Sequence, residues 1–210
     1  YCLKDGIDKI ILEKLEKLSD KSLEEKLQQQ RESNPFIDMA HIAVGYERMI
    51  WLTAWILKSK KTGCFDALIN TKDTLSRTPL HWAAFYNKPR IIYMLVKAGA
   101  NIESKDFLGN TPLHITTFRG SFNAAEILLT LNANPNCRNN KYRNPLHEVA
   151  FKNNFNMVRL LIDYGAKLNN IAELNRTPLH EVALNNCWAT TPFLLASGAN
   201  VNAQDIHGDT

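Results

Sequence analysis

Cysteine is scarce in this chain of 210 residues, and its four cysteines lie far apart, with no Cys-x-x-Cys pair among them. Zinc ribbons and disulfide-rich domains need closely spaced cysteines, so the pattern argues against both and favours a reducing compartment. We therefore expect a cytoplasmic or nuclear location, or the host cytosol if the protein is a secreted effector.

Long hydrophobic runs are also absent. The most apolar stretch, residues 49–57, covers only nine positions, whereas a helix that spans a bilayer needs about twenty. We therefore predict no membrane insertion. The net charge of +4 is mild; it permits acidic partners, and it gives little support to nucleic acid as a partner.

The common signatures of catalysis are missing as well. The sequence contains no Gly-rich phosphate loop, no Gly-x-Ser-x-Gly motif and no His-Glu-x-x-His motif, and these are the local patterns on which many enzymes depend. No cysteine stands with a histidine in a recognisable pattern. We predict no catalytic residue, no metal, no cofactor and no small-molecule substrate.

What the chain does have is an internal repeat with a fixed stride of 33 residues. A period in this range indicates stacked supersecondary units, which build extended surfaces for binding other macromolecules. Four tetrapeptides mark it: Thr78-Pro79-Leu80-His81, Thr111-Pro112-Leu113-His114, Asn144-Pro145-Leu146-His147 and Thr177-Pro178-Leu179-His180.

Each unit is predicted to be a helix, a short turn and a second helix. The Thr or Asn is a good helix N-cap, and the proline after it suits the first helical position. Gly99, Asn132, Gly165 and Gly198 would end the second helices in the left-handed conformation. The apolar positions of these helices, including the column Val96, Leu129, Ile162 and Leu195, are predicted to be core. Polar, turn-rich segments that project as tips join the units: 73–77, 106–110, 139–143 and 172–176.

These motifs, with the Gly-Ala-Asn-Ile and Gly-Ala-Asn-Val endings of some units, resemble ankyrin repeats. The resemblance implies an all-α solenoid with hairpin tips, and it is clear over residues 73–210. We divide the chain into an N-terminal helical segment (1–35), a degenerate and elongated first repeat (36–72), repeats 2 to 5 (73–105, 106–138, 139–171 and 172–204), and the start of a sixth repeat (205–210).

The two ends allow more than one interpretation. Residues 1–35 are predicted to be amphipathic helices that cap the stack, form a dimer, or are the tail of an upstream domain. The first repeat resembles the others at His41 but carries seven extra residues before His81. Because end repeats need a polar outer face, we expect further repeats or another domain after Thr210, the alternative being a self-sufficient stack whose last hairpin frays.

The resemblance implies that the repeated histidines hydrogen-bond within and between units, which makes a metal or catalytic role improbable. Glu148 and Glu181, which follow two of them, look like ordinary surface residues. Trp51, Trp55, Trp82 and Trp188 are predicted to be core residues.

In such stacks the tips and first helices line a concave groove. Phe85, Phe118 and Phe151 share one column there, which is either exposed for binding or packed inside. The tip arginines individually look solvated, although aromatics flanked by arginines are typical of hot spots. We expect a partner segment with apolar anchors and some acidic residues. The predicted partner-binding residues are Leu75, Arg77, Phe85, Tyr86, Phe107, Leu108, Phe118, Arg119, Lys141, Arg143, Phe151, Lys152, Leu174 and Arg176.

Three functions stay open. The first is a non-catalytic protein-interaction module, within a scaffold, adaptor or effector. The second is a regulator, because Thr74 to His81 and Asp106 to His114 resemble the inhibitor-of-NF-κB group, which binds dimeric transcription factors. The third is a targeting module of a larger enzyme.

Overall fold

The computed structural model describes residues 69–150, 152, 154–187 and 189–210. In these ranges the chain forms helix pairs and turns and contains no β-strand. The first helices of the pairs start at the motif prolines, one repeat apart: α6 (Pro79–Phe85), α8 (Pro112–Arg119), α10 (Pro145–Ala150) and α12 (Pro178–Leu184). The second helices are α7 (Pro89–Lys97), α9 (Phe122–Thr130), α11 (Phe155–Asp163) and α13 (Thr191–Ala196).

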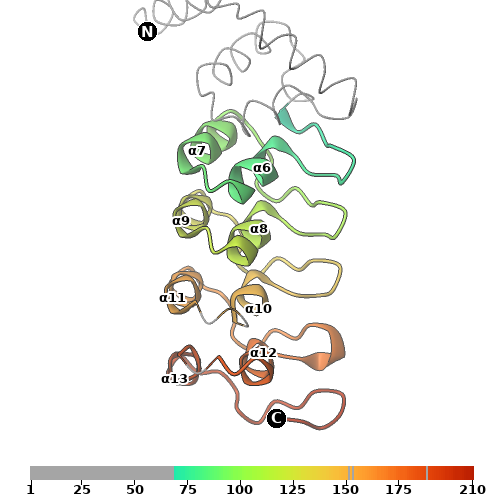
Figure 1. Cartoon of the computed structure of the whole chain (residues 1–210), viewed down its shortest axis with the longest axis vertical. Helices are drawn as coiled ribbons and strands as arrows, with labels where there is room; N and C mark the ends of the chain where they lie inside the picture. The colour runs from blue at the N-terminus through green and yellow to red at the C-terminus, as the bar shows by residue number, and fades with distance from the viewer. Residues whose placement is uncertain (1–68, 151, 153, 188) are drawn as a thin grey trace, which may run out of the picture.

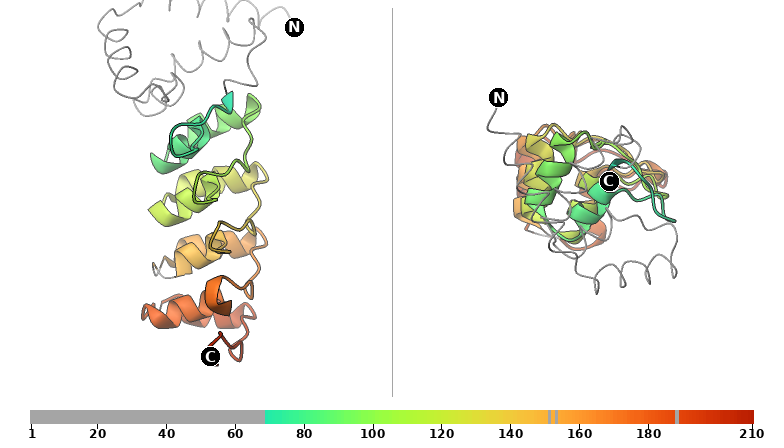
Figure 2. Two further views of the ribbon diagram at one scale, coloured as in Figure 1. Left: turned by 90° about the vertical axis from the view of Figure 1, so that its right-hand side faces the viewer. Right: turned by 90° about the horizontal axis from the view of Figure 1, so that it is seen from above.

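The pairs stack into one column with two helical layers (Figure 1). The first helices form an inner layer, the second helices form an outer layer, and the tips project from the inner layer on the side away from the outer one. Figure 2 shows that successive units overlie one another along the axis. The described part is therefore an all-helical repeat stack, as predicted.

The core lies between the layers and between neighbouring units. Leu80, Leu113 and Leu146 of the repeated motif are at most 1% exposed, and Leu128 and Leu161 of the outer helices are fully buried. Burying a leucine side chain contributes about 2–3 kcal/mol. Because each unit is sealed by its neighbour, the stack is stabilised along its length and not around one centre.

The predicted helix ends are confirmed. Gly99, Gly165 and Gly198 have φ angles of 105°, 84° and 98°, and Asn132 has 67°. These residues terminate α7, α11, α13 and α9, since only glycine and a few residues such as asparagine adopt this conformation at low cost.

The core prediction is wrong for Leu195. Leu129 and Leu195 occupy the same position in their repeats, but Leu129 is 3% exposed and Leu195 is 40% exposed. The physical reason is position: α13 belongs to the last described unit, and no further described helix pair covers its flank.

The tips are joined to one another by backbone hydrogen bonds. Each closes on itself, as where Asp73 N–H donates to the Arg77 carbonyl at 2.9 Å. Each tip after 73–77 also donates to the tip before it, as where Phe107 N–H donates to the Leu75 carbonyl at 3.0 Å. The first residue of the tip stabilises the turn further, because Asp73 Oδ1 accepts from the backbone N–H groups of Leu75 and Arg77, both at 2.9 Å. The tips are thus a continuous, ordered edge.

Candidate functional site

The tips and the inner helices enclose a groove with a volume of about 910 Å³. Its lining comes from four successive tips and from α6, α8, α10 and α12. The structure brings nine predicted partner-binding residues together in this groove: Leu75, Arg77, Phe85, Tyr86, Phe107, Leu108, Phe118, Lys141 and Arg143.

The other five predicted residues lie elsewhere. Arg119 and Lys152 are exposed but do not line the groove. Leu174, which is 42% exposed, lines a separate hollow with Tyr142 and Ile171. Arg176 is half-buried against the following tip, where its Nε lies 3.6 Å from Asp205 Oδ2. Phe151 lies outside the described residues.

The phenylalanine column is exposed where the structure describes it. Phe85 is 39% exposed and Phe118 is 51% exposed, so the packed alternative does not hold for these two residues. Each ring carries a cation from the next repeat: the Arg119 guanidinium lies 4.4 Å from the Phe85 centroid, and Lys152 Nζ lies 4.1 Å from the Phe118 centroid. Such contacts favour one orientation of each ring, so the rings of Phe85 and Phe118 are held in place before any partner binds.

Sequence reasoning placed Trp82 in the core, and this is wrong in part. The indole is half-buried and lines the groove floor. Its Nε1–H donates to Asp73 Oδ2 at 3.1 Å, and its ring stacks on Tyr86 with centroids 5.8 Å apart. Trp82 is therefore held by a polar contact on one edge and presents apolar surface to the groove, as interface tryptophans do.

The tip arginines are not simply solvated, contrary to expectation. Arg77 Nη2 lies 2.8 Å from Asp73 Oδ2, and the guanidinium lies 4.5 Å from the Trp82 centroid. Asp73 has a lowered pKa: burial opposes this shift, but hydrogen bonds and the charge of Arg77 outweigh it. These internal pairings remove the main reason to expect an acidic partner segment at the tips.

Arg143 is the centre of a cluster that sequence reasoning missed. Its Nε donates to Glu148 Oε1 at 2.8 Å, and its Nη1 donates to Glu181 Oε1 at 2.7 Å. Its Nη2 also donates to the His147 carbonyl at 3.1 Å. Burial alone would lower the pKa of Arg143, but the two carboxylates raise it above its ordinary value.

The interpretation of Glu148 and Glu181 as ordinary surface residues is wrong. Their side chains are only 14% and 11% exposed, and both line the groove. The detectable pattern was their stride of 33 residues, which placed them on the same face as Trp82 and Ile115. What sequence could not show was that Arg143 of the tip reaches both.

The histidine column holds the tips in place, as predicted. His81 Nε2 lies 3.0 Å from the Asn110 carbonyl of the next tip. The same contact joins His114 to Arg143 O, His147 to Arg176 O and His180 to Asp209 O, at 3.0–3.1 Å. Burial, only partly offset by these bonds, lowers the pKa of His114 and of His147 to about 4. The imidazoles of His114 and His147 are therefore neutral at pH 7. His41 lies outside the described residues.

One cysteine and histidine do approach each other. Cys137 Sγ lies 3.6 Å from His114 Nδ1 and 3.3 Å from Thr111 Oγ1. Burial raises the pKa of the Cys137 thiol to about 11. Since the thiolate is the nucleophilic form, this pair lacks the charge state that nucleophilic catalysis needs. Over the described ranges, no three His, Cys, Asp or Glu residues are grouped to hold a metal ion.

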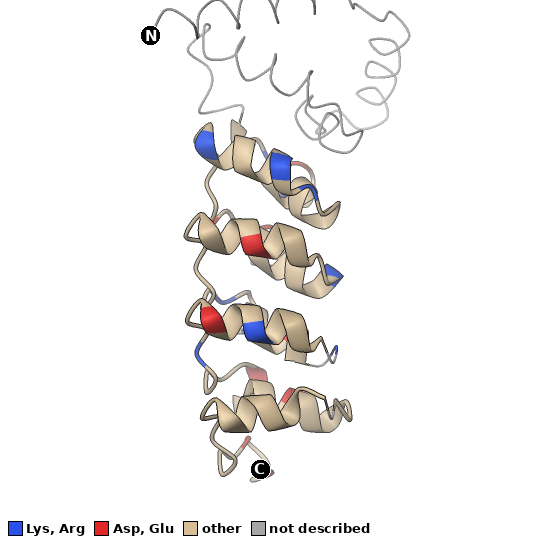
Figure 3. Cartoon of the chain, turned by 90° about the vertical axis from the view of Figure 1, so that its left-hand side faces the viewer, with Lys and Arg blue, Asp and Glu red and all other residues tan. Residues whose placement is uncertain are grey.

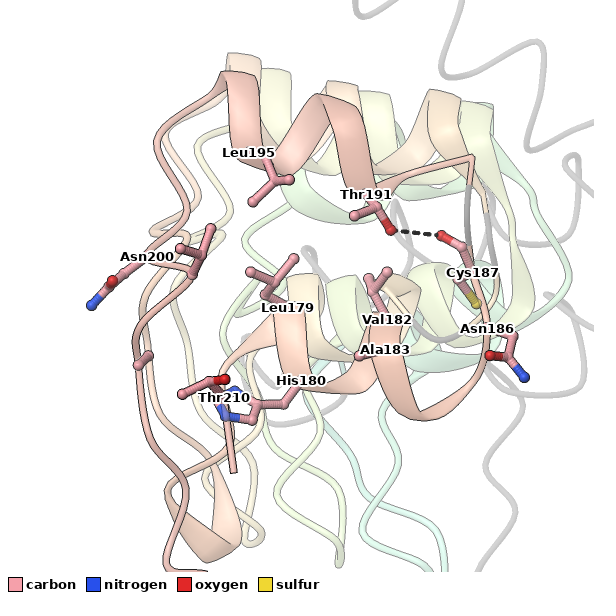
Figure 4. A pocket seen from close by; sticks show the side chains of 12 residues that line it. Leu179, His180, Val182, Ala183, Asn186, Cys187, Thr191, Leu195, Asn200 and Thr210 are labelled. Atoms are coloured by element: carbon pink, nitrogen blue, oxygen red, sulfur yellow. Dashed lines mark hydrogen bonds between the residues drawn. The ribbon is translucent and has the colours of Figure 1, made fainter. Parts of the chain in front are cut away.

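A second cavity, of about 310 Å³, lies at the open end of the stack (Figure 4). Leu179, Val182 and Leu195 line it between α12 and α13, and Thr191 Oγ1 donates to the Cys187 carbonyl at 3.3 Å beside it. It is the apolar flank that in earlier units is covered by the following helix pair.

In the described ranges, no helix is long and apolar enough to cross a bilayer.

The stacked helix pairs and their projecting tips define a helical-repeat solenoid. The family model for ankyrin repeats, in three copies, matches residues 40–139 and again residues 113–205. The chain belongs to the ankyrin-repeat family. Members of this family are in general protein–protein interaction modules.

Proposed function

We propose that the chain is a non-catalytic module that binds a segment of another protein in the groove between its tips and inner helices. The observation that carries the proposal is a cluster of exposed apolar side chains. Six of them, each 39–54% exposed, meet on the floor and tips of the groove: Leu75, Phe85, Tyr86, Phe107, Leu108 and Phe118.

Exposed aromatic and aliphatic side chains gathered in one concavity are typical of interaction sites, since monomeric proteins rarely expose large contiguous apolar patches. Aromatic residues held in defined orientations bind with a small loss of conformational entropy. Here three sets of contacts hold the groove side chains in defined orientations: the backbone hydrogen bonds between successive tips, the histidine contacts to the tips, and the contacts of cations with the phenylalanine rings. A reducing compartment is part of the proposal, because the four cysteines are widely spaced in the sequence and Cys137 is a free thiol.

The test compares capture by three forms of the chain. The wild type serves as bait in cell lysate beside the double variant Phe85→Ala/Phe118→Ala. The matched control is Tyr93→Ala/Tyr164→Ala, which removes two aromatics of similar exposure (50% and 40%) from α7 and the end of α11. We expect the control to keep the specific partner and the groove variant to lose it.

Retention of every partner by a folded groove variant would show that the groove is not the binding site. The narrower hypotheses remain predictions. Recovery of a Rel-type dimeric transcription factor by the wild type alone would support the inhibitor-like regulator, and the full reading frame would decide whether a catalytic domain accompanies the repeats.

A further inference from the structure

The groove changes its chemistry halfway along the stack. The fourth residue of each inner helix lies on the groove floor: Trp82 and Ile115 in the first two described repeats, Glu148 and Glu181 in the next two. The tips follow the same division, since Leu75, Phe107 and Leu108 precede Lys141 and Glu173. One half is therefore aromatic and aliphatic, and the other half is ionic.

The ionic half carries excess negative charge. Two carboxylates share the single positive charge of Arg143, since Glu148 and Glu181 each accept a hydrogen bond from it through Oε1. Glu173, on the exposed tip beyond, adds a third carboxylate, against one further cation, Lys141. Whereas the whole chain has a net charge of +4, this half of the groove has a net charge of −1.

Other nearby cations do not line this half of the groove, although Arg138 shares the neighbouring hollow with Glu173. Arg119 and Lys152 lie over the phenylalanine rings and outside the groove lining. Arg77 is paired with Asp73 in the apolar half. Glu148, Glu173 and Glu181 thus line the groove as carboxylates, which accept hydrogen bonds from cationic groups.

We propose that the groove takes a bipartite protein segment: apolar side chains, at least one of them large, lie over Trp82, Phe85 and Phe118, and one or more Lys or Arg side chains lie over Glu148, Glu173 and Glu181. Arg143 positions the two floor carboxylates for the incoming cation. The two chemistries fix the direction of the segment along the stack, since a reversed segment would place apolar groups on carboxylates and a cation beside Arg77. This inference deepens the proposed function and rests on it.

The described part of the outer face offers no comparable arrangement. Figure 3 shows isolated charges on the outer helices, without a cluster of either sign. The difference gives matched control positions. Glu126 is an exposed glutamate of α9 on that face, and Glu173 is an exposed glutamate of the groove whose replacement leaves every described core contact intact.

The test uses a displayed library of random 16-residue peptides, selected against the intact chain, followed by synthesis of the recovered sequences. We expect sequences with large apolar residues on one side and Lys or Arg on the other. Replacing their basic residues by Gln should weaken binding about tenfold, and so should Glu173→Gln/Glu181→Gln in the protein, whereas Glu126→Gln should change nothing. When the Gln-substituted peptide is measured against the Glu173→Gln/Glu181→Gln protein, the loss of affinity should be smaller than the sum of the two separate losses.

Glu173→Gln alone keeps the test valid if the double variant does not fold, with a smaller expected loss of about threefold. Peptides that need Phe85 and Phe118 but are acidic, or are insensitive to the glutamate variants, would overturn the bipartite assignment and leave the proposed function standing. Peptides that bind equally well to Phe85→Ala/Phe118→Ala would overturn both. Failure to recover any binder would count against both as well.

Discussion

The substitution Asn144→Thr tests how closely the polar contacts of the repeat are matched. Asn144 is fully buried, and its Nδ2 has no hydrogen-bond partner. Its Oδ1 lies 2.6 Å from His147 Nδ1 and accepts the His147 backbone N–H at 3.0 Å. His147 Nε2 donates to the Arg176 carbonyl, so in the neutral imidazole Nδ1 is an acceptor. Two acceptors therefore face each other.

Neither protonation nor rotation of the amide relieves this contact. Protonating Nδ1 is opposed at pH 7, because burial lowers the pKa of His147 to about 4. Turning the amide over would set Nδ2 against the His147 N–H. A threonine hydroxyl solves the problem, because it can donate to Nδ1, as the geometry at 2.8–3.0 Å allows in the other three described repeats.

We expect Asn144→Thr to raise the free energy of unfolding by about 1–2 kcal/mol, which is the usual cost of a buried polar group without a partner. The mirror substitution Thr111→Asn should lower it by a similar amount. Urea unfolding followed by circular dichroism at pH 7, with unchanged m-values, measures both. Helix capping alone predicts the reverse, since Asn caps slightly better than Thr. A destabilised Asn144→Thr variant would refute the reasoning.

Four further predictions concern stability and reactivity. The pKa of His114 and of His147 is about 4 in the folded state and near 6.5 in the unfolded state, so the unfolded chain binds more protons between these pH values. The free energy of unfolding should therefore be at its full value above pH 7 and fall by about 3 kcal/mol per histidine as the pH drops towards 4, which urea unfolding at several pH values measures. Arg143→Met leaves two largely buried carboxylates without their cation and should lower the free energy of unfolding by about 2 kcal/mol at pH 7, measured by urea unfolding; a variant as stable as the wild type would contradict the pairing. Gly109→Ala would bring a Cβ atom within 2.3 Å of the next tip at a φ of 78°, so hydrogen exchange should speed up in the tips and not in the outer helices. Cys137 should resist iodoacetamide at pH 8 until the chain is unfolded, because burial raises its pKa to about 11; rapid labelling of the folded chain would contradict this.

Sequence patterns predicted the fold well because the stacking is local and periodic. The proline, histidine and helix-ending positions recur at one stride, and each has a local physical role that needs no knowledge of distant contacts. The exception in the core, Leu195, arose because burial depends on a neighbouring unit and not on the residue's own helix.

The site was harder to predict, because charge and exposure there depend on side-chain reach between repeats. The exposure of the apolar tip residues and of the phenylalanine column was predictable from their repeated positions in the sequence. The pairing of Arg143 with Glu148 and Glu181 joins a tip to two successive inner helices, and no spacing rule gives the direction of a long side chain. Trp82 shows the same limit, since its contact with Asp73 turns a residue expected in the core into part of the groove floor.

The central claim is that binding occurs in the groove, and the Trp82 indole N–H is a direct probe of it. Nuclear magnetic resonance spectra of the labelled chain, titrated with a selected peptide, report each N–H separately. We predict that the Trp82 indole signal and the amides of Leu108 and Lys141 shift together with one dissociation constant, while those of Tyr93 and Tyr164 stay fixed. Shifts confined to the outer helices, with an unmoved Trp82, would contradict the account.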